Sequence, residues 1–160
     1  MEPRIETLVE KKLIGKRIRM SLADNKRFQL WNSFMQQRKE IENTVSNNLY
    51  SVEVYDSTDY FKNFSPHTEY DKWAAVEVSD VDAIPSGMET ITIPCGLYAV
   101  FIHKGPASKG PETYQYIFGT WLPTSSHTLD HRPHFAVMGA KYKNEDSDSE
   151  EEIWVRVMNI

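Results

Sequence analysis

Residues 96–122, GLYAVFIHKGPASKGPETYQYIFGTWL, set an alternating strand directly before a helix. The strand ends near Lys104, and Gly110-Pro111 then opens the helix, because proline is well tolerated at the first helical position. Apolar residues recur along this helix at helical spacing, which gives it one face for packing on a sheet. They are Tyr114, Ile117, Phe118, Trp121 and Leu122.

Strands are predicted on both sides of this unit. Residues 89–93 form a strand that the Pro94-Cys95-Gly96 break separates from the next one, since proline removes a ladder donor. After the helix come HFAVM at 134–138 and EIWVRVMNI at 152–160. In the last strand, valines and isoleucine alternate with Glu152, Trp154 and Arg156, which indicates two different faces.

The first half of the chain has the same order. We expect a strand over Ile5–Met20 with a bulge at Gly15, and a helix from Asp24 to about Glu42. The apolar face of this helix is expected to include Phe28, Trp31 and Met35. Strands at SVEVYD (51–56) and KWAAVEVSD (72–80) follow.

The order strand, helix, strand, strand therefore occurs twice. It predicts an α+β fold: a duplicated strand-helix-strand-strand unit with an antiparallel sheet, two main helices and a central ligand cleft. We expect one domain over residues 1–160, with halves at about 1–84 and 85–160. Pockets form preferentially where substructures meet, so the ligand is expected between the halves.

Composition excludes several classes. The chain has 160 residues, a net charge of -5, 40% hydrophobic and 12% aromatic residues, all typical of a globular protein. Cys95 is the single cysteine, so no internal disulfide is possible. Met1–Glu10 lacks the pattern of a signal peptide, and no apolar run is long enough to cross a bilayer. We expect a cytoplasmic protein that contacts no membrane and binds no nucleic acid directly.

The sharpest candidate for chemistry is the pair Glu152 and Trp154, which a strand places on one face. An indole ring attracts a cation through its quadrupole, and a partly desolvated carboxylate supplies the counter-charge. Together they suit flat, lipophilic cations. The alternative is that Glu152 only ends a solvated acidic loop.

The large aromatic side chains form a second group of candidates. Tyr55 and Trp73 fall on strand faces opposite the valines and are candidates for a pocket wall, whereas Phe118 and Trp121 are expected to pack helix on sheet. For each, a buried ring in the core is the alternative.

Other chemistries have weaker support. His127, His131, His134 and Asp130 have a spacing that zinc can use, but no cysteine pair accompanies them. A Cys95 nucleophile with His103 lacks an orienting third group. No phosphate-binding glycine loop or dinucleotide motif is present, so we expect no metal and no cofactor.

Four stretches carry a resemblance that covers nearly the whole chain. GLYAVFIHKGP, PETYQYIFGTWLP, RPHF and SEEEIWVRV resemble the GyrI-like small-molecule-binding domain, which is also the effector-binding domain of many bacterial transcription activators. The resemblance implies a duplicated fold with a cleft between its halves. It implies that Glu152 is the pocket acid and Trp154 its aromatic neighbour, with Tyr55, Trp73, Phe118 and Trp121 as wall residues.

Three positions depart from the family pattern. Ala136 and Met138 stand where the family often has an acid and an aromatic or aliphatic residue, and Arg156 stands where it often has proline. One acid is missing and one base is added. Arg156 is expected either to neutralise Glu152 or to contact an anionic group of a ligand.

The sequence thus predicts stand-alone binding of lipophilic, aromatic and often cationic molecules, as in sensing or sequestration of drugs and toxins. One alternative, implied by the resemblance, is a hydrolase of cyclopropane-bearing toxins in which Glu152 is catalytic. The other is an interaction protein of the gyrase-modulator type, whose acidic run Glu145–Glu151 mimics nucleic acid to gyrase or a regulator.

Overall fold

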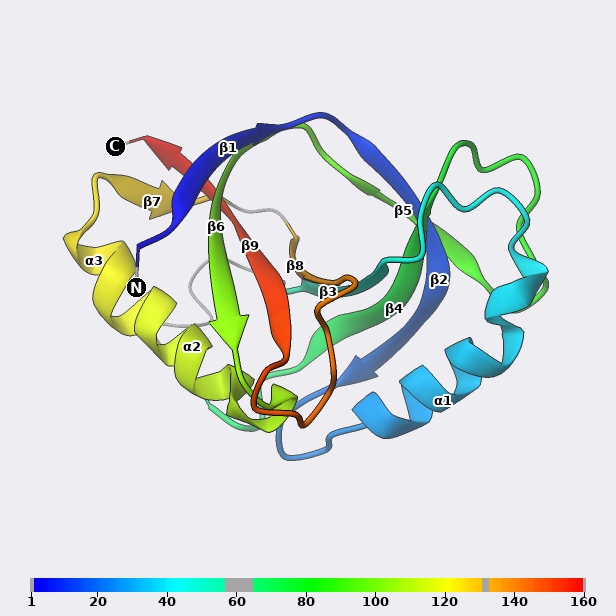
Figure 1. Cartoon of the computed structure of the whole chain (residues 1–160), viewed down its shortest axis with the longest axis horizontal. Helices are drawn as coiled ribbons and strands as arrows, with labels where there is room; N and C mark the ends of the chain where they lie inside the picture. The colour runs from blue at the N-terminus through cyan, green and yellow to red at the C-terminus, as the bar shows by residue number, and fades with distance from the viewer. Residues whose placement is uncertain (1, 57–64, 131–132, 160) are drawn as a thin grey trace.

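The computed structural model describes residues 2–56, 65–130 and 133–159 and shows one curled antiparallel sheet with helices on one side (Figure 1). Across the sheet the strands are β1 (Arg4–Leu8), β6 (Gly96–Lys104), β9 (Glu150–Asn159), β8 (His134–Met138), β3 (Leu49–Val54), β4 (Tyr70–Val78), β2 (Lys11–Met20) and β5 (Glu89–Ile93). The short strand β7 (His127–Leu129) pairs with β9. The predicted α+β class is confirmed.

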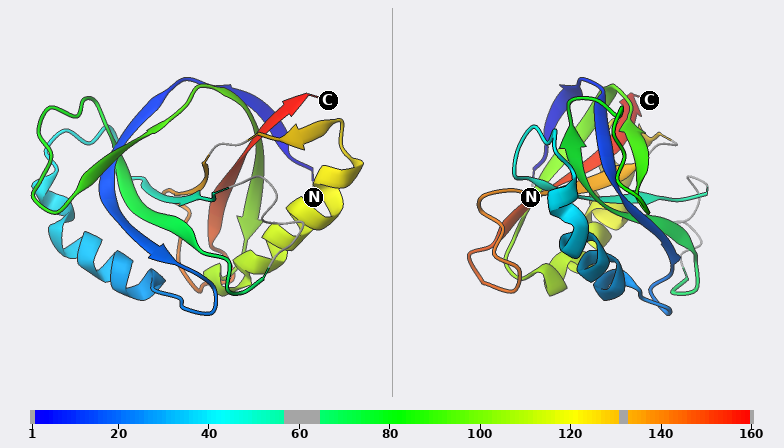
Figure 2. Two further views of the ribbon diagram at one scale, coloured as in Figure 1. Left: turned by 180° about the vertical axis from the view of Figure 1, so that it is seen from behind. Right: turned by 90° about the vertical axis from the view of Figure 1, so that its right-hand side faces the viewer.

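Each half contributes one main helix. The first half has α1 (Arg27–Gln37), which ends in a 3-10 turn over Arg38–Glu40. In the second half α2 (Gly110–Tyr116) continues through a π-helical turn (Ile117–Trp121) into α3 (Leu122–Thr124). Both helices lie on the same side of the sheet, each against strands of its own half (Figure 2).

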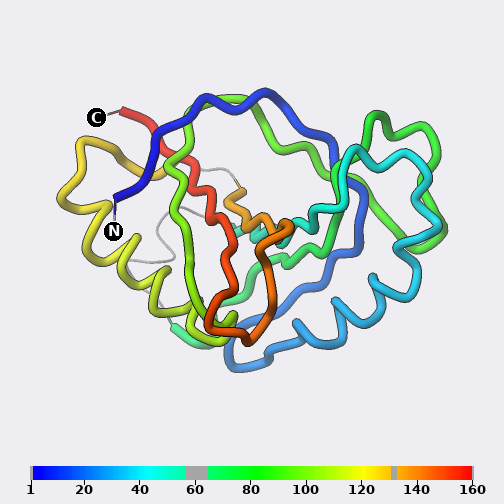
Figure 3. The backbone as a smooth tube through the Cα atoms, in the orientation of Figure 1, coloured from blue at the N-terminus to red at the C-terminus, as the bar shows by residue number. Residues whose placement is uncertain are grey.

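The strand order is the same in both directions from the centre of the sheet. β3 and β8 lie side by side in the middle of the sheet (Figure 3). In this pair Ser51 lies opposite Ala136. Outward from this pair, β4, β2 and β5 follow on one side, and β9, β6 and β1 follow on the other. The repeat of element order predicted from the sequence is therefore present in the sheet.

The central strands are buried on both faces. On the face away from the helices, the curled sheet encloses a core cluster that includes Tyr98, Phe135 and Trp154. On the helix face, α1 packs on β2 and β4 through Leu30 and Phe34, and a separate cluster forms beneath α2. The site lies between these two helix-covered clusters.

Two features of the first half differ from the prediction. Residues 5–20 form β1 and β2, which pair with opposite ends of the sheet. Gly15 is no bulge, since the β2–β4 register continues through it; a Cβ there would collide with the carbonyl oxygen of Ala74, so glycine permits a close approach of the strands.

The first helix also differs. It begins at Arg27 with no side-chain cap, so Asp24 does not cap it. Its buried residues are Leu30 and Phe34, whereas Phe28 is 78% exposed. No helix in the described ranges is both long and apolar enough to cross a bilayer.

Candidate functional site

A cavity of about 540 Å³ opens on the helix face of the central strands. Its floor comes from β3, β4, β8 and β9; one wall comes from the chain entering α1 and the other from α2 and its π-helical turn. Each half of the fold therefore supplies part of the lining, as expected for a cleft between repeated units.

Aromatic rings dominate one side of the cavity. Tyr55 stacks on Tyr70 with ring centroids 4.6 Å apart and on His134 at 5.5 Å. Phe118 lies against the same histidine at 5.7 Å and stacks on Tyr114 at 6.3 Å. These five rings line the cavity and provide flat apolar surface for an aromatic ligand.

The floor holds a buried ionic network around Glu53. Lys72 Nζ donates to Oε1 of Glu53 at 2.9 Å, and His134 Nε2 donates to Oε2 at 3.1 Å. The hydroxyl of Tyr55 reaches the same carboxylate at 3.5 Å. Lys72 is 7% exposed and His134 is 3% exposed, so the network is shielded from solvent.

The partners of Glu53 decide its ionisation. Burial on its own would raise the pKa of this carboxyl, but the Lys72 ammonium and the hydrogen bond from His134 outweigh it and hold the pKa well below its usual range. Glu53 is therefore an ionised group whose charge is already balanced within the protein.

Glu151 is the second acid of the cavity. It lies on β9 opposite His103, and burial raises its pKa, although His103, Arg27 and Lys72 oppose that rise electrostatically. Within residues 2–56, 65–130 and 133–159, no cationic side chain holds its carboxylate as Lys72 holds that of Glu53, so it is the acid that a cationic group could approach most easily.

Two of the residues expected in a pocket wall line this cavity, namely Tyr55 and Phe118. Trp73 lies on the other face of the sheet, because it pairs with Val52, whose side chain belongs to the enclosed core. Trp121 lies in the core beneath α2, edge-on to Phe101 at 5.1 Å. Ligand contact by either tryptophan stays a prediction.

Glu152 and Trp154 do meet, but on the face away from the cavity. Trp154 Nε1 donates to Glu152 Oε1 at 3.0 Å, and Arg4 Nη2 donates to the other carboxylate oxygen at 2.8 Å. The indole stacks on Phe135 with centroids 5.6 Å apart. The indole is thus part of the enclosed core, whereas the Glu152 side chain is 36% exposed, and the role of this pair in ligand binding stays a prediction.

The three departures from the family pattern lie in different places. Ala136 and Met138 line the cavity, so the missing acid would have been there. Arg156 does not neutralise Glu152: its Nε lies 3.2 Å from Asp130, and its guanidinium lies over the ring of Tyr98.

The alternative chemistries gain no support. His131 lies outside the described residues, and the rest of the chain that the structure describes holds no cluster of three metal-ligating side chains. Cys95 is exposed beside one end of β6, whereas His103 lies near the other end.

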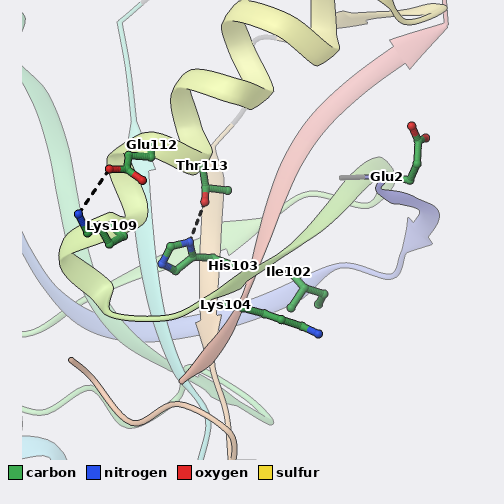
Figure 4. Close-up of a pocket in the computed structure, with 7 residues that line it drawn as sticks. All are labelled: Glu2, Ile102, His103, Lys104, Lys109, Glu112 and Thr113. Carbon is green, nitrogen blue, oxygen red and sulfur yellow. Dashed lines mark hydrogen bonds and ion pairs between the residues drawn. The ribbon is translucent and has the colours of Figure 1, made fainter. Parts of the chain in front are cut away.

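A second hollow, of about 620 Å³, lies beside His103 (Figure 4). There Nδ1 of His103 contacts the hydroxyl of Thr113 at 2.7 Å and Nε2 donates to the carbonyl of Pro106 at 2.9 Å. These bonds tie β6 to the start of α2. The histidine is therefore already engaged in positioning the helix.

The acidic run Glu145–Glu151 is partly folded onto the protein. Glu145 accepts hydrogen bonds from the backbone and hydroxyl of Ser108, at 3.1 and 2.7 Å. Asp146 accepts one from the backbone of Asp148, and Glu151 faces the cavity. Binding of a basic protein partner stays a prediction. Fewer acids of this run are available to such a partner than the sequence suggested, because these three already have contacts within the protein.

Sequence reasoning missed Glu53, Lys72, His134 and Glu151 as a group. One signal was available: Lys72 and Glu53 occur in strands that are rich in apolar residues on both faces. A charged residue in such a strand must be buried and therefore paired.

Comparisons with known proteins agree with this architecture. The family model of the GyrI-like small molecule binding domain matches residues 1–158. The EcmrR C-terminal domain is 16% identical with a TM-score of 0.75, covering 99% of this chain and 98% of its own. SAV2435 bound to tetraphenylphosphonium is 15% identical with a TM-score of 0.68, covering 99% and 94%.

A hydrolase from Listeria innocua is 12% identical with a TM-score of 0.61, covering 98% of this chain and 92% of its own. Among curated proteins, no significant match is found. At these identities the solved structures establish the fold only.

Proposed function

This chain belongs to the GyrI-like small-molecule-binding domain family, and we propose that its cavity binds lipophilic aromatic molecules, cations among them, with Glu151 as the counter-charge. The observation that carries the proposal is the combination of five rings with a half-buried acid of raised pKa around one cavity of about 540 Å³. A structural neighbour binds tetraphenylphosphonium, a ligand of this kind.

The rings and the acid have separate tasks in this proposal. Tyr114 and Phe118 offer stacked faces to aryl groups, and their quadrupoles attract a cation. The carboxylate of Glu151 becomes ionised at the cost of burial, and a bound cation offsets that cost. Affinity for a cation is therefore linked to ionisation of this acid.

Replacing Glu151 by glutamine is expected to weaken tetraphenylphosphonium binding by about tenfold, because the counter-charge is removed from a partly desolvated site. Isothermal titration calorimetry measures this, with neutral triphenylphosphine oxide as the matched ligand, whose affinity changes little. In the natural protein, affinity for the cation falls on acidification. The fall begins above the ordinary glutamate range, since the pKa of Glu151 is raised and protonation removes the charge.

Glu152→Gln is the matched control, since it removes the neighbouring acid from the opposite face of the same strand. The proposal expects it to leave the affinity for tetraphenylphosphonium within about twofold of the natural protein. If Glu152→Gln weakens the cation and Glu151→Gln does not, the acid predicted from the sequence is the ligand contact and the assignment of Glu151 is overturned.

Hydrolysis is a second candidate, favoured by the raised pKa of Glu151, which suits a general acid in an apolar cavity. A neighbour of the same fold is a hydrolase. Incubation with a cyclopropane-bearing toxin, followed by mass spectrometry, tests it. Product that forms with the natural protein and not with Glu151→Gln supports hydrolysis; a stable one-to-one complex without product supports binding alone.

A further inference from the structure

The two halves place opposite charges at equivalent positions of the cavity. Ser51 and Ala136 face each other at the centre of the β3–β8 pair, so Val52 and Val137 are equivalent residues of the repeat. Their partners on the next strands outward are therefore also equivalent.

Val52 pairs with Trp73 on β4, and Val137 pairs with Glu152 on β9. The preceding residues, Lys72 and Glu151, thus occupy the same place in the two halves, and both side chains line the cavity. The same position of the cavity floor therefore occurs twice in the fold, and it is occupied by an ammonium in one half and by a carboxylate in the other.

The ammonium of Lys72 forms an ion pair with a carboxylate on the cavity floor. It is 2.9 Å from the carboxylate of Glu53, whose second oxygen is held by His134. The rings of Tyr55 and Tyr70 stack beside this carboxylate. A buried acid next to aromatic rings is the chemistry that recognises organic ammonium groups.

We propose that Glu53, with the rings of Tyr55 and Tyr70, is a second cation subsite, specific for a primary alkylammonium group, and that the side chain of Lys72 fills it from within the chain. An incoming cation is then directed to Glu151. A ligand reaches Glu53 only by displacing the Lys72 ammonium, which excludes a permanent cation from this end of the cavity.

Among the residues that the structure describes, four charged side chains line the cavity, and this proposal assigns a role to each of them. Glu53 and Lys72 balance each other within the subsite, while Arg27 at the start of α1 acts electrostatically on Glu151 of β9. The cavity therefore discriminates between ligands by the position of their positive charge, which must lie near Glu151. A bulky cation without an N–H donor cannot replace the ammonium of Lys72 at Glu53.

The test removes the tethered ammonium and supplies a free one. Lys72→Ala deletes the atoms of n-propylamine from the side chain, so propylammonium chloride is the matching probe. We expect millimolar propylammonium to raise the melting temperature of Lys72→Ala by about 3 °C or more, in a saturable manner. The natural protein is not expected to respond, because its subsite is filled.

Two controls fix the interpretation. 1-Propanol and sodium chloride at matched concentration test for apolar filling and for ionic strength, and neither should reproduce the shift. The double variant Glu53→Gln/Lys72→Ala keeps the space and lacks the acid, so it should not respond to propylammonium. Equal shifts in the single and double variants, or no shift in the single variant, overturn the proposal.

The Lys72→Ala variant is destabilised, because the Glu53 carboxylate has lost the Lys72 ammonium. Whether propylammonium restores its folded state therefore also tests the subsite. If it is unfolded at 25 °C, recovery of its far-ultraviolet circular dichroism with propylammonium supports the subsite. No recovery, while the double variant is folded, contradicts it. This result does not depend on tetraphenylphosphonium binding, so the subsite and the proposed function can fail separately.

Discussion

Replacing Glu53 by glutamine is expected to lower the free energy of unfolding by about 3–5 kcal/mol at pH 7, because the Lys72 ammonium is then buried without its counter-charge. Lys72 is 7% exposed, so water cannot take over the lost interaction. Urea denaturation followed by circular dichroism measures the change. This is one of the two largest effects that we expect from a single substitution in the chain.

The matched control is Glu89→Gln, which removes one of the two acidic partners of Arg17, from an ion pair of similar length. That pair spans 3.1 Å with side chains 46% and 49% exposed, so its loss should change stability by less than about 1 kcal/mol. The double variant Glu53→Gln/Lys72→Met removes both buried charges and should regain most of the lost stability. Equal losses for Glu53→Gln and Glu89→Gln would contradict a buried network.

The same network gives stability a defined pH dependence. The pKa of Glu53 is lowered in the folded protein, so its contribution is complete above the pKa of the unfolded chain and is lost as pH falls toward the folded value. Unfolding free energy should therefore decrease on acidification below about pH 5. In Glu53→Gln this part of the decrease is absent.

Trp154→Ala should mainly reduce stability, whereas Phe118→Ala should mainly reduce affinity for tetraphenylphosphonium. Trp154 is 9% exposed and stacks on Phe135, so its truncation should cost about 3–5 kcal/mol of stability. It does not line the cavity, and at a temperature where the variant is folded, its affinity for tetraphenylphosphonium should be nearly unchanged.

Phe118 is half-buried, and its ring forms part of the cavity wall. Truncation should cost only about 1–2 kcal/mol of stability and weaken tetraphenylphosphonium by about tenfold. Denaturation and calorimetry on the same two variants separate these effects. A Trp154→Ala protein that is stable but cannot bind would assign the ligand to the enclosed face of the sheet.

The order of elements could be predicted because local patterns specify it. Alternation identified the strands, the Gly110-Pro111 start identified the second helix, and the repetition of the order indicated duplication. The topology of the first twenty residues could not be predicted in this way. The turn after Leu8 joins two strands that both alternate, so the pattern alone does not show that they pair at opposite ends of the sheet.

The sequence did not show which face of the last strand, β9, points to the cavity. Glu150, Glu151 and Glu152 put an acid on both faces, and the residues that follow are buried on both faces as well. Alternation shows which side chains share a face of the strand, but it does not show which of the two faces the helices cover. Both the acid-indole pattern and the resemblance selected Glu152, whereas the pairing with β6 and β8 directs Glu151 to the cavity.

The Glu53 network was hidden for a different reason. Alternation correctly separates Glu53 from Val52 and Val54, and an acid opposite valines usually faces water. In this fold the helices cover that face, and Lys72 and His134 come from strands distant in the sequence. Tertiary pairing therefore determines that the acid is buried.

A crystal structure with tetraphenylphosphonium tests the central claim most directly. We expect one cation in the cavity between α1 and α2, with aryl rings against Tyr114 and Phe118 and the phosphorus closer to Glu151 than to Glu53. The Lys72–Glu53 pair should remain closed. A cation bound beside Glu152 and Trp154, or seated on Glu53 with Lys72 displaced, would contradict the account.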